Sequence, residues 1–178
     1  MLYNVAQLMK APVGTSLVYD IDEEDAQLDS DLKVIGPLTG HVRLRRINQG
    51  LLVDGWVELT LDLTCTRCLK EFEQPMHVDF AEQFSPTVDV LTGLPMPPFD
   101  EEEIFPIDEH HLVDLTEAIR QNVLLALPMV TLCREDCKGL CPQCGHDLNL
   151  GPCECQPEVD TRMSVLAKLL QDGSNSES

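Results

Sequence analysis

The arrangement of the cysteines constrains the fold of this chain more than any other feature of its sequence. Eight cysteines lie in two groups along 178 residues. The first group is the turn Cys65-Thr-Arg-Cys68, and the second runs from Cys133 to Cys155. The segment Cys141-Pro-Gln-Cys144 is followed by Gly145 and is typical of a metal-binding knuckle, because proline fixes one φ angle and glycine accepts an unusual one. Sets of four thiolates are common tetrahedral ligands of zinc.

The order of the cysteines favours two sites with four ligands each. Cys65 continues the apolar side of the strand before it, and Cys68 continues the apolar side of the strand after it, so both sulfurs are expected on the core face. The preferred grouping joins this pair with Cys133 and Cys137 and leaves a second, self-contained site. We expect one or two zinc ions in closed, structural sites, with these ligands: Cys65, Cys68, Cys133, Cys137, Cys141, Cys144, Cys153 and Cys155.

Three other interpretations of the cysteines remain open from the sequence. They could be free residues without a metal, or a C-x-x-C turn could carry redox chemistry, although here it joins two antiparallel strands rather than opening a thioredoxin-like unit. The spacing Cys137-x3-Cys141-x2-Cys144 also occurs around iron–sulfur clusters of radical enzymes. Only 34 residues follow Cys144, too few for the barrel that this radical chemistry needs. A catalytic zinc needs an open position, which surplus thiolates disfavour.

The charge of the chain limits its partners. With 31 acidic and 12 basic residues the formal net charge is -19, which argues against a broad nucleic-acid-binding face and against docking on anionic membranes. Four basic residues lie near the cysteine turns in the sequence, and three arginines lie on a predicted strand. They are either the solvated side of strands or a local basic spot that contacts RNA or a protein partner: Arg43, Arg45, Arg46, Arg67, Lys70, Arg134 and Lys138.

The first residues and the apolar runs predict a cytoplasmic protein. Residues 1–14 lack the basic start, apolar run and cleavage site of a secretory signal. The longest apolar run, Val123 to Leu127, is far shorter than the roughly 20 residues that span a bilayer. In a reducing cytosol the eight thiols are not expected to form four disulfides. We therefore expect no membrane association, and no motif for a small-molecule substrate is present.

The hydrophobic pattern predicts an α+β fold: an antiparallel β meander or partly open barrel with two C-terminal helices and a cysteine-rich zinc-knuckle module. Alternating residues predict mainly antiparallel strands within 1–84, with the acidic run Asp20 to Asp25 as a solvated loop. We expect one structural domain. Its other parts are an acidic, proline-rich loop over 85–110, a helix within 111–132 capped by Asp114 and Glu117, the cysteine module over 133–156, a C-terminal helix over 157–173 and a disordered tail over 174–178.

Taken together, these motifs resemble one family over roughly Val34 to Leu170. The segments that carry the resemblance are Leu63-Thr-Cys-Thr-Arg-Cys-Leu69, Asp114 to Pro128 with its Leu-Ala-Leu-Pro ending, Leu132 to Gly145, Asp147-Leu-Asn149, Cys153-Glu-Cys155, and Asp160 to Leu170, where Thr161 replaces an expected proline. They are similar to the YceD family, the large ribosomal RNA subunit accumulation proteins. The resemblance implies a role in 23S rRNA accumulation or processing and in large-subunit assembly, and it implies no catalytic residues.

Two functional hypotheses follow. The first is a non-enzymatic ribosome-biogenesis factor whose partners are ribosomal precursor particles, rRNA or basic ribosomal proteins, since an acidic surface complements a basic one. The second is a redox or metal-dependent enzyme centred on the cysteines. A stoichiometric metal with protected thiols favours the first hypothesis, and a free, low-pKa thiol or an open ligand position favours the second.

Overall fold

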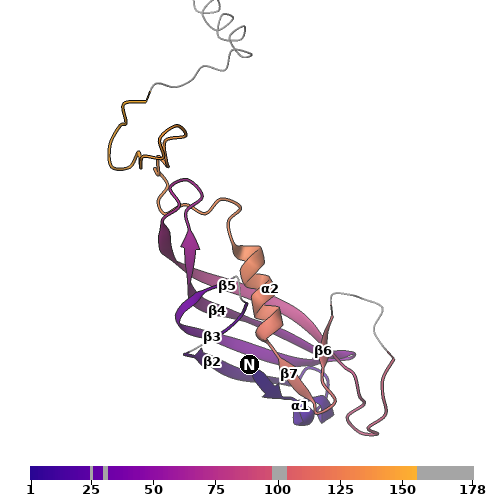
Figure 1. Cartoon of the computed structure of the whole chain (residues 1–178). Coiled ribbons are helices and arrows are strands. Elements are labelled where there is room, and N and C mark those ends of the chain that lie inside the picture. Colours follow the sequence, from indigo (N-terminus) through magenta and orange to yellow (C-terminus); the bar gives the residue numbers. More distant parts are fainter. Residues whose placement is uncertain (25, 30–31, 98–103, 156–178) are drawn as a thin grey trace, which may run out of the picture.

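The protein is built on one open, twisted sheet with a smaller sheet beside it (Figure 1). A computed structural model describes residues 1–24, 26–29, 32–97 and 104–155. The large sheet has the strand order β2-β3-β4-β5-β6, and the small sheet pairs β1 with β7. The strands are β1 (Leu2–Asn4), β2 (Ser16–Glu23), β3 (Val34–Ile47), β4 (Gly50–Thr64), β5 (Glu71–Pro86), β6 (Phe105–Ile107) and β7 (Leu112–Asp114), and the helices are α1 (Ala6–Lys10) and α2 (Thr116–Ala126).

The predicted alternation in the central strands is confirmed. On β4, Val53 and Val57 are fully buried, and on β5 the even-numbered Val78 and Phe80 face the same core. β3 and β4 are joined by a tight turn that ends at Gly50, whose φ is +138°. A Cβ at Gly50 would lie 2.0 Å from the carbonyl oxygen of Phe84, so only glycine fits where the turn meets β5.

One face of the large sheet carries the core. The helix α2 lies across this face in Figure 1, and its buried residues Ala118, Ile119 and Val123 pack into the same cluster as the strands. The side-chain amide of Asn122 also donates a hydrogen bond of 2.7 Å to Glu82 on β5. Among the described residues, no helix covers the other face of the sheet, as expected for an antiparallel meander with a single apolar side.

Several predicted elements differ from those observed. Barrel closure is not seen, because among the described strands β2 and β6 are the two edges of an open sheet. The predicted 85–110 loop contains β6, which pairs in parallel with β5. The loop thus serves as the crossover that a parallel pair requires. The acidic run at Asp20 was wrongly placed in a loop, because β2 extends to Glu23 and pairs with β3.

The ends of the helical regions also differ from the prediction. The short helix α1 and the strand β7 were not predicted, and α2 begins at Thr116, two residues after the predicted cap Asp114. Asp114 accepts hydrogen bonds from the backbone and hydroxyl of Thr116, and Glu117 bonds forward to Arg120, so the expected reciprocal cap is absent. The predicted helix over 157–173 and the tail over 174–178 lie outside the described residues.

The β4–β5 hairpin extends beyond the rest of the sheet and positions the cysteine-rich module. The last pair between β3 and β4 joins Val34 to Leu61, whereas β4 and β5 remain paired up to Thr64 and Glu71. Figure 1 shows this two-stranded ribbon projecting from the sheet, with the orange cysteine-rich segment packed at its tip. The module therefore lies at one end of an elongated molecule.

Candidate metal centres

The first cysteine cluster lies where the hairpin tip meets the segment that follows α2. Cys65 and Cys68 come from the β4–β5 turn, and Cys133 and Cys137 come from the later segment. Their sulfur atoms lie within 4.8 Å of one another, with Sγ–Sγ distances of 3.8 Å for Cys65–Cys137 and 3.6 Å for Cys68–Cys133. A tetrahedron with metal–sulfur bonds of about 2.3 Å has edges of about 3.8 Å. These distances fit a shared metal and are far longer than a disulfide of about 2.05 Å.

The backbone of the hairpin tip directs N–H groups at the sulfur of Cys65. The turn is closed by the Leu69 N–H, which donates to the Cys65 carbonyl at 2.9 Å, and Leu69 adopts a positive φ of 58°. Burial raises the pKa of Cys65, but hydrogen bonds from the backbone N–H groups of Cys133, Cys68 and Arg67 outweigh it and lower that pKa to about 6. The site thus stabilises a thiolate, which is the form that binds a metal.

Two other thiols of this cluster, Cys68 and Cys133, resist ionisation without a cation, because their pKa values are raised. Burial and the neighbouring thiols raise the pKa of Cys133 to about 12. One thiolate among packed thiols opposes the ionisation of the rest. A divalent cation at the centre reverses this effect, because its charge stabilises all of the coordinating thiolates.

The second cluster forms within the module itself. Its members are Cys141, Cys144, Cys153 and Cys155, with all sulfurs within 4.8 Å of one another. The Gly145 N–H closes the knuckle on the Cys141 carbonyl at 2.9 Å, with a φ of 70° that suits glycine. Hydrogen bonds from the backbone N–H groups of Cys144 and Gln143 lower the pKa of Cys141 to about 6. Cys141 is buried and Cys144 is exposed, so this cluster is the more accessible one.

Both clusters match the grouping that the sequence predicted, and both fit a closed metal site. Each offers four sulfur donors and a knuckle-type turn with N–H groups aimed at a sulfur. An all-sulfur set suits zinc or an iron–sulfur centre better than magnesium or calcium, which take oxygen ligands. Four protein ligands leave no position for water or substrate, so the geometry favours a structural role.

A polar network that the sequence did not reveal connects the two clusters. The side-chain nitrogen of Asn149 donates to Cys137 Sγ at 3.5 Å, and its oxygen accepts from the Lys138 N–H at 2.9 Å. Lys70 on the hairpin pairs with Asp147 at 2.6 Å, which ties the tip to the second knuckle. The only sequence signal for this network was the Asp147-Leu-Asn149 segment, whose two side chains are also hydrogen-bonded to each other at 2.7 Å.

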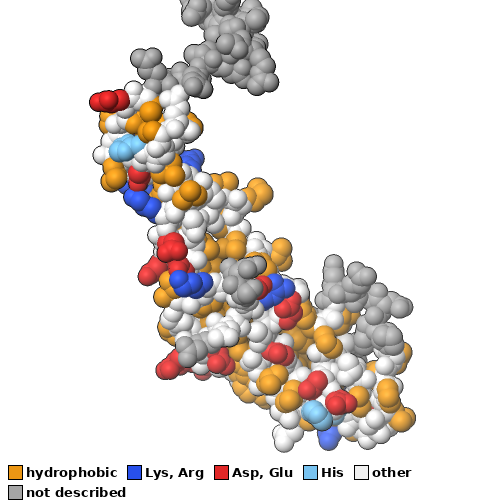
Figure 2. All heavy atoms as spheres, viewed as in Figure 1, with side chains coloured by type: hydrophobic (Ala, Val, Ile, Leu, Met, Phe, Trp, Pro, Cys, Tyr) orange, Lys and Arg blue, Asp and Glu red, His pale blue; other side chains and the backbone are white. Residues whose placement is uncertain are grey.

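The seven predicted contact residues do not form one basic spot. Arg43 pairs with Asp54, and the side chain of Arg46 donates to the carbonyl of Gly50 at 2.8 Å, near the opposite end of β4 from the cysteines. Ten strand residues separate Asp54 from Thr64, which is about 30 Å. Figure 2 accordingly shows blue side chains at separate places along the molecule. Arg45 lies 3.9 Å from the same Asp54 carboxylate.

The remaining basic residues surround the first cluster. Arg67 donates to the Cys137 carbonyl at 2.8 Å, Lys70 pairs with Asp147, and Arg134 bonds to Asn149 at 2.7 Å. The contacts of Arg67 and Lys70 hold the module to the hairpin, and that of Arg134 lies within the module. Three of the four basic residues therefore have a structural role in addition to any contact with RNA or protein. A contact with RNA or with a protein partner remains a prediction for all seven residues.

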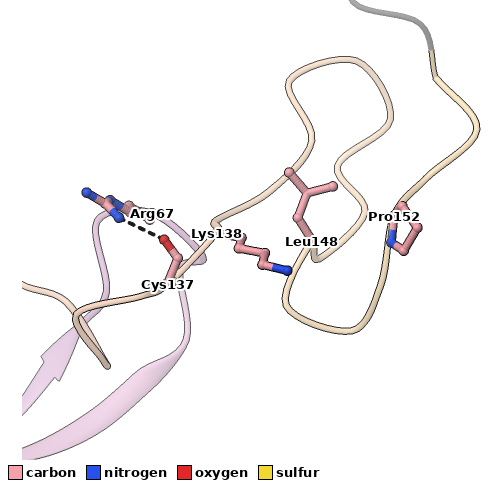
Figure 3. A pocket seen from close by; sticks show the side chains of 5 residues that line it. All are labelled: Arg67, Cys137, Lys138, Leu148 and Pro152. Carbon is pink, nitrogen blue, oxygen red and sulfur yellow. Dashed lines mark hydrogen bonds between the residues drawn. The ribbon is translucent and has the colours of Figure 1, made fainter.

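A hollow separates the hairpin tip from the knuckle of the second cluster. It has a volume of about 730 Å³ and is lined by Arg67, Cys137, Lys138, Leu148 and Pro152. Figure 3 shows the Arg67 guanidinium bonded across to the Cys137 carbonyl, with Lys138 and Leu148 on the module side. The hollow therefore borders the first cluster through Cys137.

Comparison with known proteins assigns this chain to a family. The model of the family described as "Large ribosomal RNA subunit accumulation protein YceD" matches residues 53–170, which is more than half of the chain. The chain belongs to the YceD family. The matched region of this YceD protein begins in β4 and includes the hairpin, α2 and all eight cysteines. The two clusters and the elements that position them therefore lie within the family-defining part.

The YceD relatives differ in what their names state. An uncharacterized protein of Mycobacterium tuberculosis is 28% identical over 96% of this chain and 81% of its own length. The uncharacterized protein YlbN of Bacillus subtilis is 26% identical over 99% of this chain and 100% of its own length. A chloroplastic protein of Arabidopsis thaliana, named a large ribosomal RNA subunit accumulation protein YCED homolog, is 32% identical over 36% of this chain and 21% of its own. No solved structure matches this YceD chain.

Within its described residues, no helix combines the length and the apolarity needed to cross a bilayer.

Proposed function

We propose that this protein is a non-enzymatic, cytoplasmic factor that supports the accumulation and processing of 23S rRNA and the assembly of the large ribosomal subunit. The observation that carries the proposal is the match of the YceD family model over residues 53–170. The name of the Arabidopsis relative supports it, since that protein is described as a large ribosomal RNA subunit accumulation protein. The closed geometry of both cysteine clusters supports a binding or scaffolding role rather than chemistry.

The two clusters hold one zinc ion each in this proposal. Zinc suits four thiolates in a tetrahedron, and the Sγ–Sγ distances of 3.6 and 3.8 Å in the first cluster agree with its bond length. Structural zinc sites contribute on the order of 10 kcal/mol of folding free energy at neutral pH. The ions would therefore fix the module at the hairpin tip and present a defined surface to a precursor particle.

The charge of the protein favours basic proteins of the precursor particle as its direct partners. A formal net charge of -19 repels the phosphate backbone of rRNA and attracts cationic protein segments. Two tetrathiolate zinc sites each carry a further net charge of about −2, which strengthens this preference. RNA contact, if the basic residues near Cys137 provide it, would be confined to that end of the molecule.

The proposal is tested in a deletion strain of the source organism. The strain should accumulate less 23S rRNA relative to 16S rRNA and show fewer mature large subunits in sucrose gradients. The wild-type gene should restore both, whereas the double variant Cys65→Ser and Cys68→Ser should not. The control is Thr66→Ser in the same turn, which keeps the hydroxyl that bonds to Thr131 and should restore both. Normal 23S rRNA and normal gradients in the deletion strain would refute the proposal.

A separate measurement addresses the enzymatic alternative. Thiols of the purified protein are titrated before and after denaturation in the presence of a metal indicator. Protection of all eight cysteines until the metal is released would support structural sites. A thiol that reacts rapidly in the folded, metal-loaded protein would favour cysteine chemistry instead.

A further inference from the structure

The uncovered face of the large sheet is a broad acidic surface. We call it the outer face, because α2 and the core lie on the opposite side (Figure 1). Register places carboxylates from three strands on this one face, and they outnumber its lysines and arginines. The carboxylates are Asp20 and Asp22 on β2, Asp54, Glu58 and Asp62 on β4, and Glu71, Glu73 and Asp79 on β5.

The cations of the outer face are already engaged by two of these carboxylates. Lys33 pairs with Asp62 at 2.5 Å, and Arg43 and Arg45 both approach Asp54. Within the described residues, no lysine or arginine forms an ion pair with Glu58 or with any outer-face carboxylate of β5. The middle of the outer face therefore retains uncompensated negative charge.

An exposed tryptophan lies at the centre of this charge. Trp56 is 36% exposed and stacks on the ring of His77, with ring centroids 5.4 Å apart. His77 in turn lies 3.1 Å from the carboxylate of Glu58 and 3.7 Å from that of Asp79. An exposed aromatic ring flanked by carboxylates can attract a cation, through the ring quadrupole and through the opposite charge.

A hollow lies beside His77, the ring on which Trp56 stacks. The pairing of β3 and β4 shifts between Ile35 and Thr39, and the resulting bulge leaves a space of about 510 Å³. Ile35 and Met76 give this hollow apolar walls, and Glu58 and His77 bring polar groups to it. The combination suits a long side chain with an aliphatic stem and a cationic head, since the stem packs on apolar atoms while the head meets the carboxylate.

We propose that the outer face binds an arginine- and lysine-rich segment of a partner protein, with Trp56 and Glu58 as its central contacts. An arginine of the partner would stack on Trp56 and bond to Glu58, and a neighbouring cation would meet Asp79. This inference rests on the proposed function, because it names the surface through which the protein meets the basic proteins of a precursor particle. A nucleic acid does not fit, since its phosphates would face carboxylates.

Binding is measured with a fluorescein-labelled nona-arginine peptide by fluorescence anisotropy at physiological salt. The protein should bind the peptide, and Glu58→Lys should weaken binding about tenfold or more. Glu109→Lys is the matched control, because Glu109 is also exposed, also lies beside a histidine, at 3.7 Å from His110, and changes the net charge equally. It should weaken binding less than about twofold. Equal losses in the two variants would show general charge attraction and would overturn the proposal.

Two further variants test the tryptophan. Trp56→Ala should weaken peptide binding about tenfold, whereas Trp56→Phe keeps an aromatic ring and should stay within about threefold of the wild type. Thermal unfolding of each variant confirms that the sheet is intact. Unchanged binding by a folded Trp56→Ala protein would overturn the central role of this residue. Tighter binding of a single-stranded RNA of the same length than of the peptide would overturn the choice of partner.

The deletion strain separates this inference from the proposed function. If deletion lowers 23S rRNA, expression of Glu58→Lys should fail to restore it and Glu109→Lys should restore it. Full restoration by Glu58→Lys would overturn the outer face as the functional surface and leave the proposed function standing. A deletion strain with normal 23S rRNA would refute the proposed function, while the peptide measurements would still decide whether the outer face binds cationic segments.

Discussion

Asn149 holds the two cysteine clusters together through both ends of its side-chain amide. Its nitrogen donates to the sulfur of Cys137, and its oxygen accepts from the backbone of Lys138 and from Arg134. A donor aimed at a coordinating sulfur offsets part of its negative charge and fixes its position. Asn149 therefore supports the first cluster from outside the ligand set.

Removal of this amide should weaken metal binding. We predict that Asn149→Ala releases zinc to a colorimetric chelator about tenfold faster than the wild type, the lower end of the usual effect of such supporting groups. Asn48→Ala, in the turn between β3 and β4, is the control and should release zinc at the wild-type rate. Identical release from Asn149→Ala and Asn48→Ala would show that the amide does not support the site.

Gly139 marks a close approach between the module and the hairpin. Its φ is +75°, and an added Cβ would lie 2.9 Å from the carbonyl oxygen of Arg67. Gly36 has nearly the same φ of +73° but no atom within 4 Å of an added Cβ. The two glycines differ in surroundings and not in backbone strain.

The comparison of Gly36 with Gly139 gives a prediction for the stability of the protein. Gly36→Ala should lower the free energy of unfolding by about 1–2 kcal/mol through its left-handed φ alone. Gly139→Ala should lower the stability of the attached module further, because the module must also move away from Arg67. Denaturant unfolding of the metal-loaded proteins, followed by fluorescence and by metal release, provides the comparison. Equal effects of Gly36→Ala and Gly139→Ala on metal release would argue against close packing of Gly139 on Arg67.

At the level of single residues, the sequence predicts the candidate metal ligands better than the residues that hold those ligands in place. The eight cysteines could be grouped because C-x-x-C spacing and strand parity restrict where their sulfurs lie. Asn149 and Lys70 could not be assigned, since their roles depend on how the hairpin tip and the module pack. The contact between Arg67 and Cys137 joins residues 70 positions apart and has no local signature.

Among the elements, the long strands were predictable and the short ones were not. β4 and β5 show alternation over many residues, and their register buries the expected side chains. β6 has three residues, including Pro106, and therefore shows no period. The start of β2 and the helix α1 depend on packing against β3 rather than on local propensity.

The helix α2 carries an ion pair that makes stability depend on pH. Arg120 bonds to Glu117 at 2.7 and 2.8 Å and to Asp29 at 2.9 Å. The hydrogen bonds from Arg120 and Gln121 lower the pKa of Glu117 to about 2. A carboxylate with a lowered pKa stabilises the fold above its ordinary value of about 4.5 and loses this contribution as pH falls toward 2.

We predict that Glu117→Gln is less stable than the wild type at pH 6 by less than about 1 kcal/mol, because the pair is partly exposed. The difference should shrink between pH 4.5 and 2, as the wild-type carboxylate becomes protonated. Thermal unfolding of both proteins at each pH measures this difference, with Glu109→Gln as the control. A difference that stays constant down to pH 2 would contradict the role of the ion pair.

The described part of the molecule consists of a sheet with its own core and, at one end, a module that carries the two candidate metal sites. The main core contains no cysteine, whereas the small second core consists of Cys65, Cys68 and Cys137 with neighbouring apolar residues. Backbone hydrogen bonds from Thr66 to Thr131 and from Leu140 to Arg67 add polar contacts between the hairpin and the module. In the proposed two-zinc form, metal binding would supply much of the free energy that fixes the module.

Removal of the metal should loosen the module selectively. With a strong chelator and a reductant, we predict rapid proteolysis within residues 131–155 while the fragment from β1 to α2 survives and keeps its β-sheet circular dichroism signal. Readdition of zinc should restore protection. Cooperative loss of the whole fold on chelation would show that the sheet is not independent of the metal.

Elemental analysis of the purified protein, combined with native mass spectrometry, tests the two metal sites most directly. The predicted result is two zinc ions per chain, with one ion retained when Cys141 and Cys144 are both replaced by serine. A mass with no bound metal, or with disulfides in place of free thiolates, would contradict the assignment of the clusters as zinc sites. Stoichiometric iron in place of zinc would contradict it as well and would point to redox chemistry.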